Sequence, residues 1–269
     1  GNLSLNYTNY FAGINYGSII YSHFSDSLGS FSAGLSYLNY GRFDRADEAG
    51  NITGTFNASE YAFNLIYSRS IDSLINLGVN LKPVISQLES YISLGVAIDL
   101  GASWESRDGL LSAGLTARNI GIQLTTYGGR REKLPFELLA GMSVKLRHAP
   151  LRFSVTARHL EKYKLIYDYA QNDDPYSKAE QIAENIMRHL VIGAEIVPTE
   201  NFFIAAGFNY RRRKELLYEA RSSVVGFSMG AGIRTSTLDI TFSRARYHLA
   251  GASTNLSLVL KPMLFKKFK

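Results

Sequence analysis

Residues that could carry out catalysis or hold a metal ion are few and scattered in this sequence. None of the 269 residues is Cys, which excludes disulfides, thiolate metal sites and thiol nucleophiles. The chain has no nucleophile motif and no glycine-rich nucleotide-binding loop. Its histidines show no metal-ligand spacing such as HxxxH, and they are His23, His148, His159, His189 and His248. We therefore expect no enzymatic activity, no metal site and no cofactor.

Four oxygen-bearing side chains lie close together in one predicted loop, at Asp44, Asp47, Glu48 and Asn51. Their spacing resembles that of calcium ligands but does not follow the register of an EF-hand loop. We favour a solvated loop over a calcium site.

Two segments are candidates for contact with a partner protein. Segment 173–187 begins with two Asp and a Pro, which suit the N-cap and first turn of a helix, and its apolar residues form one stripe. We expect a short helix in a long loop, acting either as a lid or as a docking surface. The second segment is the basic run 211–214. The partner-binding candidates are Asp173, Asp174, Tyr176, Ile182, Ile186, Arg211, Arg212 and Arg213.

The formal net charge of +6 and the pI near 9.3 are compatible with nucleic acid or anionic lipid as a partner. No basic run alternates with aromatic residues as in a nucleic-acid platform. We therefore expect no nucleic-acid binding.

The elements that must position these residues are strands, because the dominant hydrophobic period is two. From Tyr91 to Glu105 every even position is apolar, whereas the odd positions are mostly small, polar or charged. A helix, with a period of about 3.6, would scramble these two sets. The uncharged segment 2–25 is too rich in Asn, Ser, Tyr and Gly to be a transmembrane helix.

The same alternation recurs along the whole chain and predicts a single domain, residues 1–269, of about fourteen strands. Short links alternate with long ones at 43–57, 120–134, 161–187 and 213–222, as in outer-membrane barrels with periplasmic turns and extracellular loops. An even number of strands places both termini in the periplasm. The predicted strands are 3–9, 12–24, 31–42, 58–69, 74–86, 91–105, 110–119, 135–148, 150–160, 188–198, 201–212, 223–234, 237–247 and 252–262.

A soluble β-sandwich would also alternate, but its outer face would carry abundant charge. Here the non-apolar face is mostly Gly, Ser, Ala, Asn and Thr, and strands of about 11 residues match a tilted membrane crossing. We therefore predict an all-β, transmembrane antiparallel β-barrel with a short helix in one extracellular loop. The charges on its inner face have both signs, which favours a salt-bridged lumen over a porin eyelet. They are Lys82, Asp99, Glu105, Arg118, Glu137, Lys145, Arg152, Arg158, Glu195 and Asp239.

Several blocks of the sequence resemble the PorQ family of the type IX secretion system. They lie within residues 1–165, and the likeness is only one of pattern in the last third of the chain. The stretch expected before the first strand and a terminal aromatic residue are both missing from this sequence. The blocks are Asn2–Gly17, Ala46–Thr55, Gly78–Pro83, Asn119–Tyr127, Leu134–Glu137, His148–Thr156 and His159–Lys162.

The resemblance implies an outer-membrane barrel related to the long-chain fatty-acid transporter family. It also implies a membrane anchor for a PorZ-like surface protein, in a complex that attaches secreted cargo to anionic lipopolysaccharide. Two functions therefore compete: a non-enzymatic anchor in contact with outer-membrane lipid and lipopolysaccharide, and a transporter or channel for hydrophobic small molecules. A transporter needs a continuous apolar pocket, whereas the predicted inner face is small, polar and charged.

Overall fold

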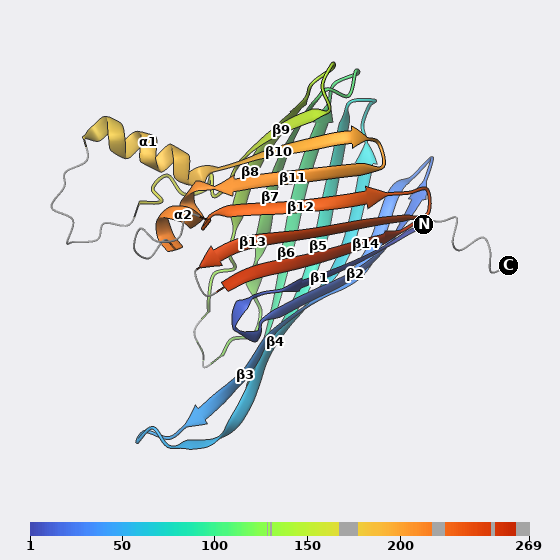
Figure 1. The fold of residues 1–269 in the computed structure, drawn as a ribbon. Coiled ribbons are helices and arrows are strands. Elements are labelled where there is room, and N and C mark those ends of the chain that lie inside the picture. The colour runs from blue at the N-terminus through green and yellow to red at the C-terminus, as the bar shows by residue number, and fades with distance from the viewer. Residues whose placement is uncertain (128, 130, 167–176, 217–223, 249–250, 262–269) are drawn as a thin grey trace.

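Fourteen antiparallel strands form a closed barrel within the described residues of the computed structural model, as the sequence predicts (Figure 1). The structure describes residues 1–127, 129, 131–166, 177–216, 224–248 and 251–261. Strands that follow one another in the chain are paired, and β1 pairs with β14 to close the barrel, with Leu3 opposite Leu260.

The strands are β1 Asn2–Asn9, β2 Asn15–Ser25, β3 Gly29–Ala46, β4 Ile52–Ser70, β5 Ile75–Leu88, β6 Tyr91–Glu105, β7 Leu111–Gln123, β8 Glu137–Lys145, β9 Leu151–Ala157, β10 Leu190–Thr199, β11 Phe202–Asn209, β12 Phe227–Arg234, β13 Leu238–His248 and β14 Gly251–Leu260. The described helices are the 3-10 turn η1 Phe11–Gly13, α1 Lys178–His189 and α2 Tyr210–Leu216. No helix in the described part of the chain is long and apolar enough to cross a membrane.

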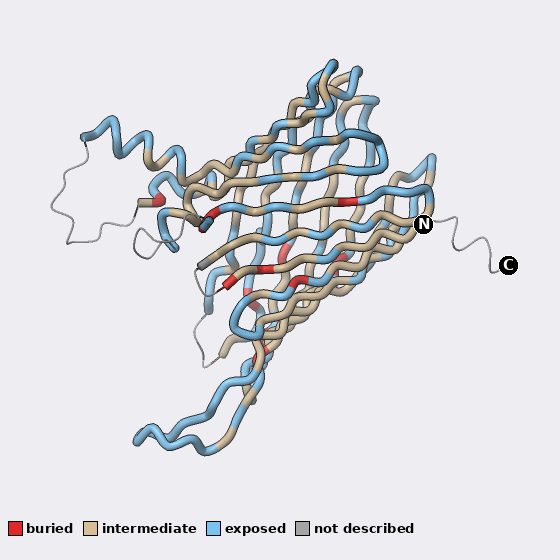
Figure 2. The backbone as a smooth tube through the Cα atoms, viewed as in Figure 1, coloured by how far each residue is buried: buried red, intermediate tan, exposed pale blue. Residues whose placement is uncertain are grey.

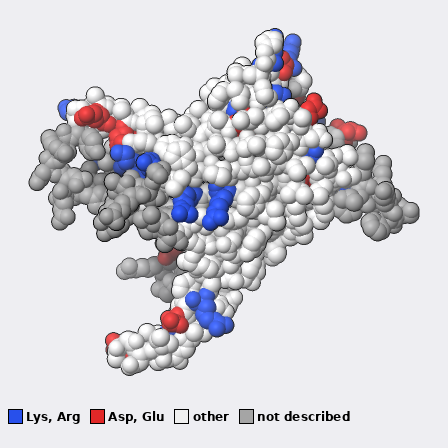
Figure 3. Space-filling model, viewed as in Figure 1, with Lys and Arg blue, Asp and Glu red and all other residues white. Residues whose placement is uncertain are grey.

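The barrel has few buried apolar side chains, because most of its apolar side chains point outward. Only Ala58, Ala97, Leu165 and Val225 are buried hydrophobic residues in the described chain, and buried segments are correspondingly rare in Figure 2. The outer wall is almost free of charge in the view of Figure 3. A surface of this size and polarity would aggregate in water, whereas it matches the lipid-facing band of an outer-membrane barrel.

The two ends of the barrel differ strongly. The N-terminus and the end of β14 lie at one end, where the turns are short, whereas α1, α2 and the tip of the β3–β4 hairpin lie at the other (Figure 1). We call these the turn end and the loop end. This arrangement is the alternation of short and long connections that the sequence predicts.

The β3–β4 hairpin corrects the predicted loop 43–57. Both strands continue past the barrel rim, with Phe43 opposite Phe56 and Ala46 opposite Ile52. The register shifts between Asn39 and Arg42, where Gly41 adopts a φ of +87° that other residues rarely take. The bulge allows the hairpin to project beyond its neighbours (Figure 1).

The helices at the loop end also differ from the prediction. Helix α1 starts at Lys178, and Ser177 rather than Asp173 or Asp174 is its N-cap, because Ser177 and Glu180 form a reciprocal capping box. The predicted strand 201–212 ends at Asn209 and continues as α2, so there are two helices of more than one turn in the described chain instead of one. The Asn209 side chain accepts a hydrogen bond from the Arg212 amide at 2.9 Å, which stabilises the first turn of α2.

Candidate functional site

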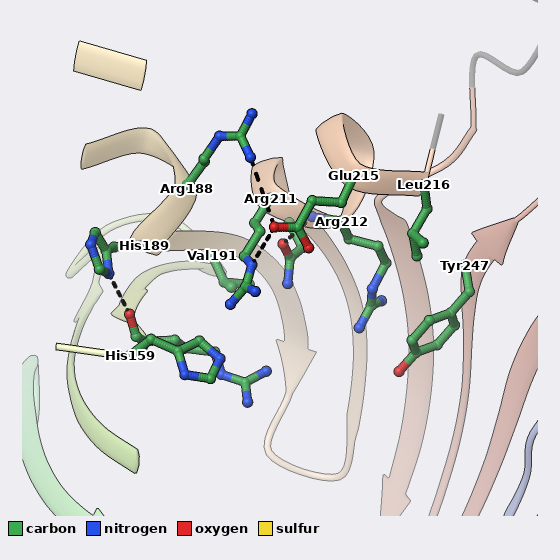
Figure 4. A pocket seen from close by; sticks show the side chains of 11 residues that line it. His159, Arg188, His189, Val191, Arg211, Arg212, Glu215, Leu216 and Tyr247 are labelled. Carbon is green, nitrogen blue, oxygen red and sulfur yellow. Dashed lines mark hydrogen bonds and ion pairs between the residues drawn. The ribbon is translucent and has the colours of Figure 1, made fainter. Parts of the chain in front are cut away.

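Basic and aromatic side chains surround a pocket of about 190 Å³ at the loop end of the barrel (Figure 4). Its wall is built by the end of β9, the last turn of α1, helix α2 and the end of β13. Both helices are continuous with a strand, α1 leading into β10 and α2 following β11, so both are attached directly to the barrel rim.

Most of the cations in this mouth pocket are already neutralised by carboxylates. Glu215 Oε1 lies 2.8 Å from Arg211 Nε and 3.8 Å from Arg188 Nη1. On the adjacent strand end, Arg158 Nη2 lies 2.7 Å from Glu137 Oε1. Paired guanidinium groups of this kind fix geometry more than they attract ligand.

Glu184 joins the two helices to each other. It accepts a hydrogen bond of 2.5 Å from the Tyr210 hydroxyl, and it lies 3.1 Å from Arg188 Nε and 3.8 Å from Lys214 Nζ. Burial is the main cause that raises the pKa of Tyr210 above its ordinary value, and the hydrogen bond to the Glu184 carboxylate is the second. The tyrosine therefore stays protonated and keeps donating to Glu184.

Arg212 differs from its neighbours because it pairs with no carboxylate among the described residues. Its guanidinium lies 3.8 Å from the centre of the Tyr247 ring. Tyr247 is in turn packed against Tyr10 and Phe11. Such stacking holds a cation in place without neutralising it, so Arg212 is the group of this pocket best able to attract an anion.

A second pocket, of about 330 Å³, lies at the base of the projecting hairpin and is aromatic. Tyr40, Phe56 and Tyr127 contribute to its wall, and the rings of Phe43 and Phe56 stack at 5.4 Å. Phe56 has the same side-chain direction as Ala58 and Glu60, whereas Phe63 points to the outer wall, so this aromatic pocket is on the lumen side. Its volume lies within the usual range for small-molecule sites.

One carboxylate lies in the wall of the aromatic pocket. Glu60 Oε1 accepts hydrogen bonds from the Tyr40 hydroxyl at 3.1 Å and from the Ser86 hydroxyl at 3.3 Å. The pocket therefore combines an apolar surface with a few polar groups that can orient a ligand.

The lumen wall carries paired charges, and seven of the ten charges that the sequence predicts for the inner face form ion pairs. Glu105, Arg118 and Lys145 form none among the described residues. Lys82 Nζ lies 2.7 Å from Asp99 Oδ1 and 2.6 Å from Asn119 Oδ1. The other cross-strand pairs are Arg152 with Glu195 at 3.3 Å, Arg158 with Glu137 at 2.7 Å, and Lys261 with Asp239 at 2.6 Å. A further hollow of about 470 Å³ in this wall is lined largely by Ser, Thr and Gly.

The structure separates the predicted partner-binding residues into three groups. Arg211 and Arg212 line the mouth pocket, and Arg213 Nη1 donates to the Val225 carbonyl at 3.4 Å. Ile182 and Ile186 are exposed on α1. Asp173, Asp174 and Tyr176 lie outside the described residues.

Neither pocket was predicted as a site. The sequence does place Arg158 on the inner face, but its neighbours Arg188 and Tyr247 come from elements that are distant in the sequence and meet only in the folded barrel. The acidic loop is a turn: the Asp47 carboxylate accepts hydrogen bonds from the amides of Ala49 and Asn51 at 3.0 and 2.8 Å. No group of three or more metal-ligating side chains occurs in the part of the chain that the structure describes.

Solved structures share the architecture at low sequence identity. The toluene transporter TodX of Pseudomonas putida matches with a TM-score of 0.55 and 10% identity, over 96% of this chain and 87% of that one. The CymD monoaromatic hydrocarbon channel gives 0.54 and 11%, over 97% and 88%, and the toluene transporter TbuX of Ralstonia pickettii gives 0.53 and 11%, over 96% and 87%. At such identities the likeness concerns the fold, that of an outer-membrane β-barrel. No protein-family model and no curated protein sequence matches the chain.

Proposed function

We propose that this barrel lets small, largely apolar molecules cross the outer membrane and that it binds them first in the aromatic pocket. The aromatic pocket is the observation that carries the proposal, because it offers stacked rings on the lumen side at the loop end. The barrels of similar fold are named as transporters or channels of toluene and monoaromatic hydrocarbons, which supports this ligand class.

The salt-bridged lumen wall argues against a wide, charge-selective pore. Its polar groups are largely satisfied by one another, as Lys82, Asp99 and Asn119 illustrate. A wall of this kind presents few free charges to a passing solute. Selection among solutes would therefore occur at the mouth pocket and the aromatic pocket rather than along the lumen.

Binding of toluene to the purified barrel in detergent, measured by calorimetry, tests the proposal. Phe56→Ala removes a ring from the aromatic pocket and should weaken binding about tenfold or more, since a buried aromatic side chain contributes roughly 1.5–3 kcal/mol. Phe63→Ala, on the same strand but on the outer wall, is the matched control and should leave binding unchanged. Equal affinity of both variants, or no binding to the unmodified protein, would overturn the proposal.

A second candidate is an anchor for a surface protein, and the loop end supplies the observation in its favour. Ile182, Ile186 and Met187 are 58%, 54% and 40% exposed on α1, outside the barrel wall. An amphipathic helix with an uncovered apolar stripe suits a protein partner. The sequence resemblance to the PorQ family supports a PorZ-like protein in this role.

The anchor is tested by charging the stripe with Ile182→Asp and Ile186→Asp. Loss of the surface partner into the medium, with toluene binding intact, would favour the anchor. Gln181→Asp adds a charge to another part of the same helix and is the control. Retention of all surface proteins in the double variant would count against the anchor and leave transport as the function.

A further inference from the structure

We propose that Arg244 and Arg246 on β13 form a binding site for the phosphate group of a membrane lipid. Both arginines lie on the outer wall of the barrel near its loop end, where apolar residues otherwise dominate. The site is separate from both pockets described above and does not depend on what the barrel transports.

The strand register places both side chains on the outer wall. Arg244 lies opposite Met229 of β12, which is 68% exposed, and the next outward residue on β13, Phe242, is 52% exposed. Arg246 follows in the same alternation, whereas Tyr247 points into the mouth pocket. Figure 3 shows basic groups over this part of the barrel on an otherwise nearly uncharged wall.

Neither arginine has a charge partner in the described chain. No carboxylate lies within ion-pair distance of Arg244 or Arg246 among these residues, and the Arg246 Nε has no hydrogen-bond acceptor. The other end of β13 shows the contrast, because Asp239 there is paired with Lys261 at 2.6 Å. Two guanidinium groups on the outer wall therefore have no compensating carboxylate among the residues that the structure describes.

The depth of the two arginines in the membrane indicates which part of a lipid they contact. An arginine that faces lipid is costly at the bilayer midplane but costs little near the interface. Arg246 is two residues from the loop end of β13, whereas the more deeply placed outward residues Ile240 and Phe242 are apolar. The pair is therefore at the level of the lipid headgroups.

Phosphate is the headgroup chemistry that fits. A guanidinium binds two phosphate oxygens at once through its planar fork. Side chains two residues apart on one strand face are about 7 Å apart at their bases, so both forks can reach one phosphate or two neighbouring ones. With the loop end facing outward, as the long connections favour, the lipid is the phosphorylated glycolipid of the outer leaflet.

The test is titration of the detergent-solubilised barrel with bisphosphorylated lipid A, followed by native mass spectrometry. The variant R244Q/R246Q should bind at least about tenfold more weakly, because it loses charge-assisted contacts. The control R107Q/R147Q removes two arginines from turns at the opposite end and should bind normally. Each variant is folded if its unboiled sample migrates faster on a denaturing gel than its boiled sample, because the intact barrel is more compact than the unfolded chain.

Three further arms make the result decisive. Dephosphorylated lipid A should bind weakly to every variant, and R244K/R246K, which keeps the charge without the fork, should bind with intermediate affinity. Millimolar inorganic phosphate should not displace the lipid. Equal lipid binding by R244Q/R246Q, equal binding of the dephosphorylated lipid, or displacement by inorganic phosphate alone would each overturn the proposed lipid site.

Discussion

Replacing Leu115 by Arg should destabilise the barrel far more than the same replacement of its neighbour Thr116. Leu115 is 50% exposed on the outer wall, whereas Thr116 lines the lumen-side hollow of about 470 Å³. The two substitutions introduce the same side chain at adjacent positions of one strand. Only the face differs, so the comparison isolates the effect of lipid.

The position of Leu115 sets the magnitude. It is four residues beyond the start of β7 at Leu111, about 14 Å along the strand at ~3.4 Å per residue. A tilt of about 45° converts this to roughly 10 Å of depth, near the middle of an apolar band about 25 Å tall. The penalty for Leu115→Arg should therefore be about 2–4 kcal/mol. Thr116→Arg should cost less than about 1 kcal/mol, because the hollow has room for the longer side chain.

The measurement is the free energy of unfolding in lipid vesicles by denaturant titration. Trp104, the single tryptophan of the chain, reports the transition by fluorescence. Refolding curves must coincide with unfolding curves for the comparison to be valid. If Thr116→Arg proved as destabilising as Leu115→Arg, the assignment of faces would be wrong, because a slip of one residue exchanges the two sets.

Three other perturbations have defined outcomes. Ser177→Ala removes the N-cap of α1 and should lower the stability of that helix by about 1 kcal/mol, seen as faster amide exchange in α1 with an unchanged barrel. Hydrogen bonds from the Asn51 side chain and amide lower the pKa of Asp47, so the stabilisation of the hairpin tip is present above pH 3.8 and is lost as the pH falls further. Hydrogen exchange of the tip amides should therefore become faster below this pH. Asp47→Asn should remove this pH dependence. Lys82→Met leaves the Asp99 carboxylate without its ion-pair partner and should lower the free energy of unfolding, measured by denaturant titration, by roughly 1–3 kcal/mol. This is less than for a fully buried pair, because the lumen is wet. A double-mutant cycle with Asp99→Asn should show coupling between the two sites.

The alternation of side chains was enough to predict the barrel, because lipid and lumen impose opposite demands on successive residues. Every predicted strand corresponds to one in the structure, and the predicted pairing of inward charges is confirmed at Lys82–Asp99 and Arg158–Glu137. These features depend only on the period of two and on the order of the strands.

Strand ends were less predictable, because local rules compete there. Residues 43–57 contain polar and charged groups typical of a loop, yet the aromatic pair Phe43–Phe56 extends the hairpin. Alternation continues into the basic run 211–213, but Asn209 starts α2 instead. Ser177 displaces the two Asp residues as N-cap because only Ser177 has Glu180 three positions later.

The pockets could not be predicted, because their walls join distant parts of the chain. Tyr247 meets Arg212 only when β13 lies beside β12 and α2 lies at the loop end of β11. Tyr127 reaches Phe56 from a different connection altogether. The spacing of residues in the sequence does not predict such contacts unless the strand register is known.

The pairing of β1 with β14 has a consequence for how the protein can be made. Asn6 on the first strand and Ser257 on the last share a hydrogen bond of 2.5 Å, so the seam unites residues 251 positions apart. Until the last strand has been synthesised, β1 has an unpaired edge, and hydrocarbon offers no partner for its amides and carbonyls. Membrane insertion must therefore follow completion of the chain, and a truncated polypeptide that stops before Gly251 would remain a substrate for periplasmic chaperones and proteases rather than a smaller barrel.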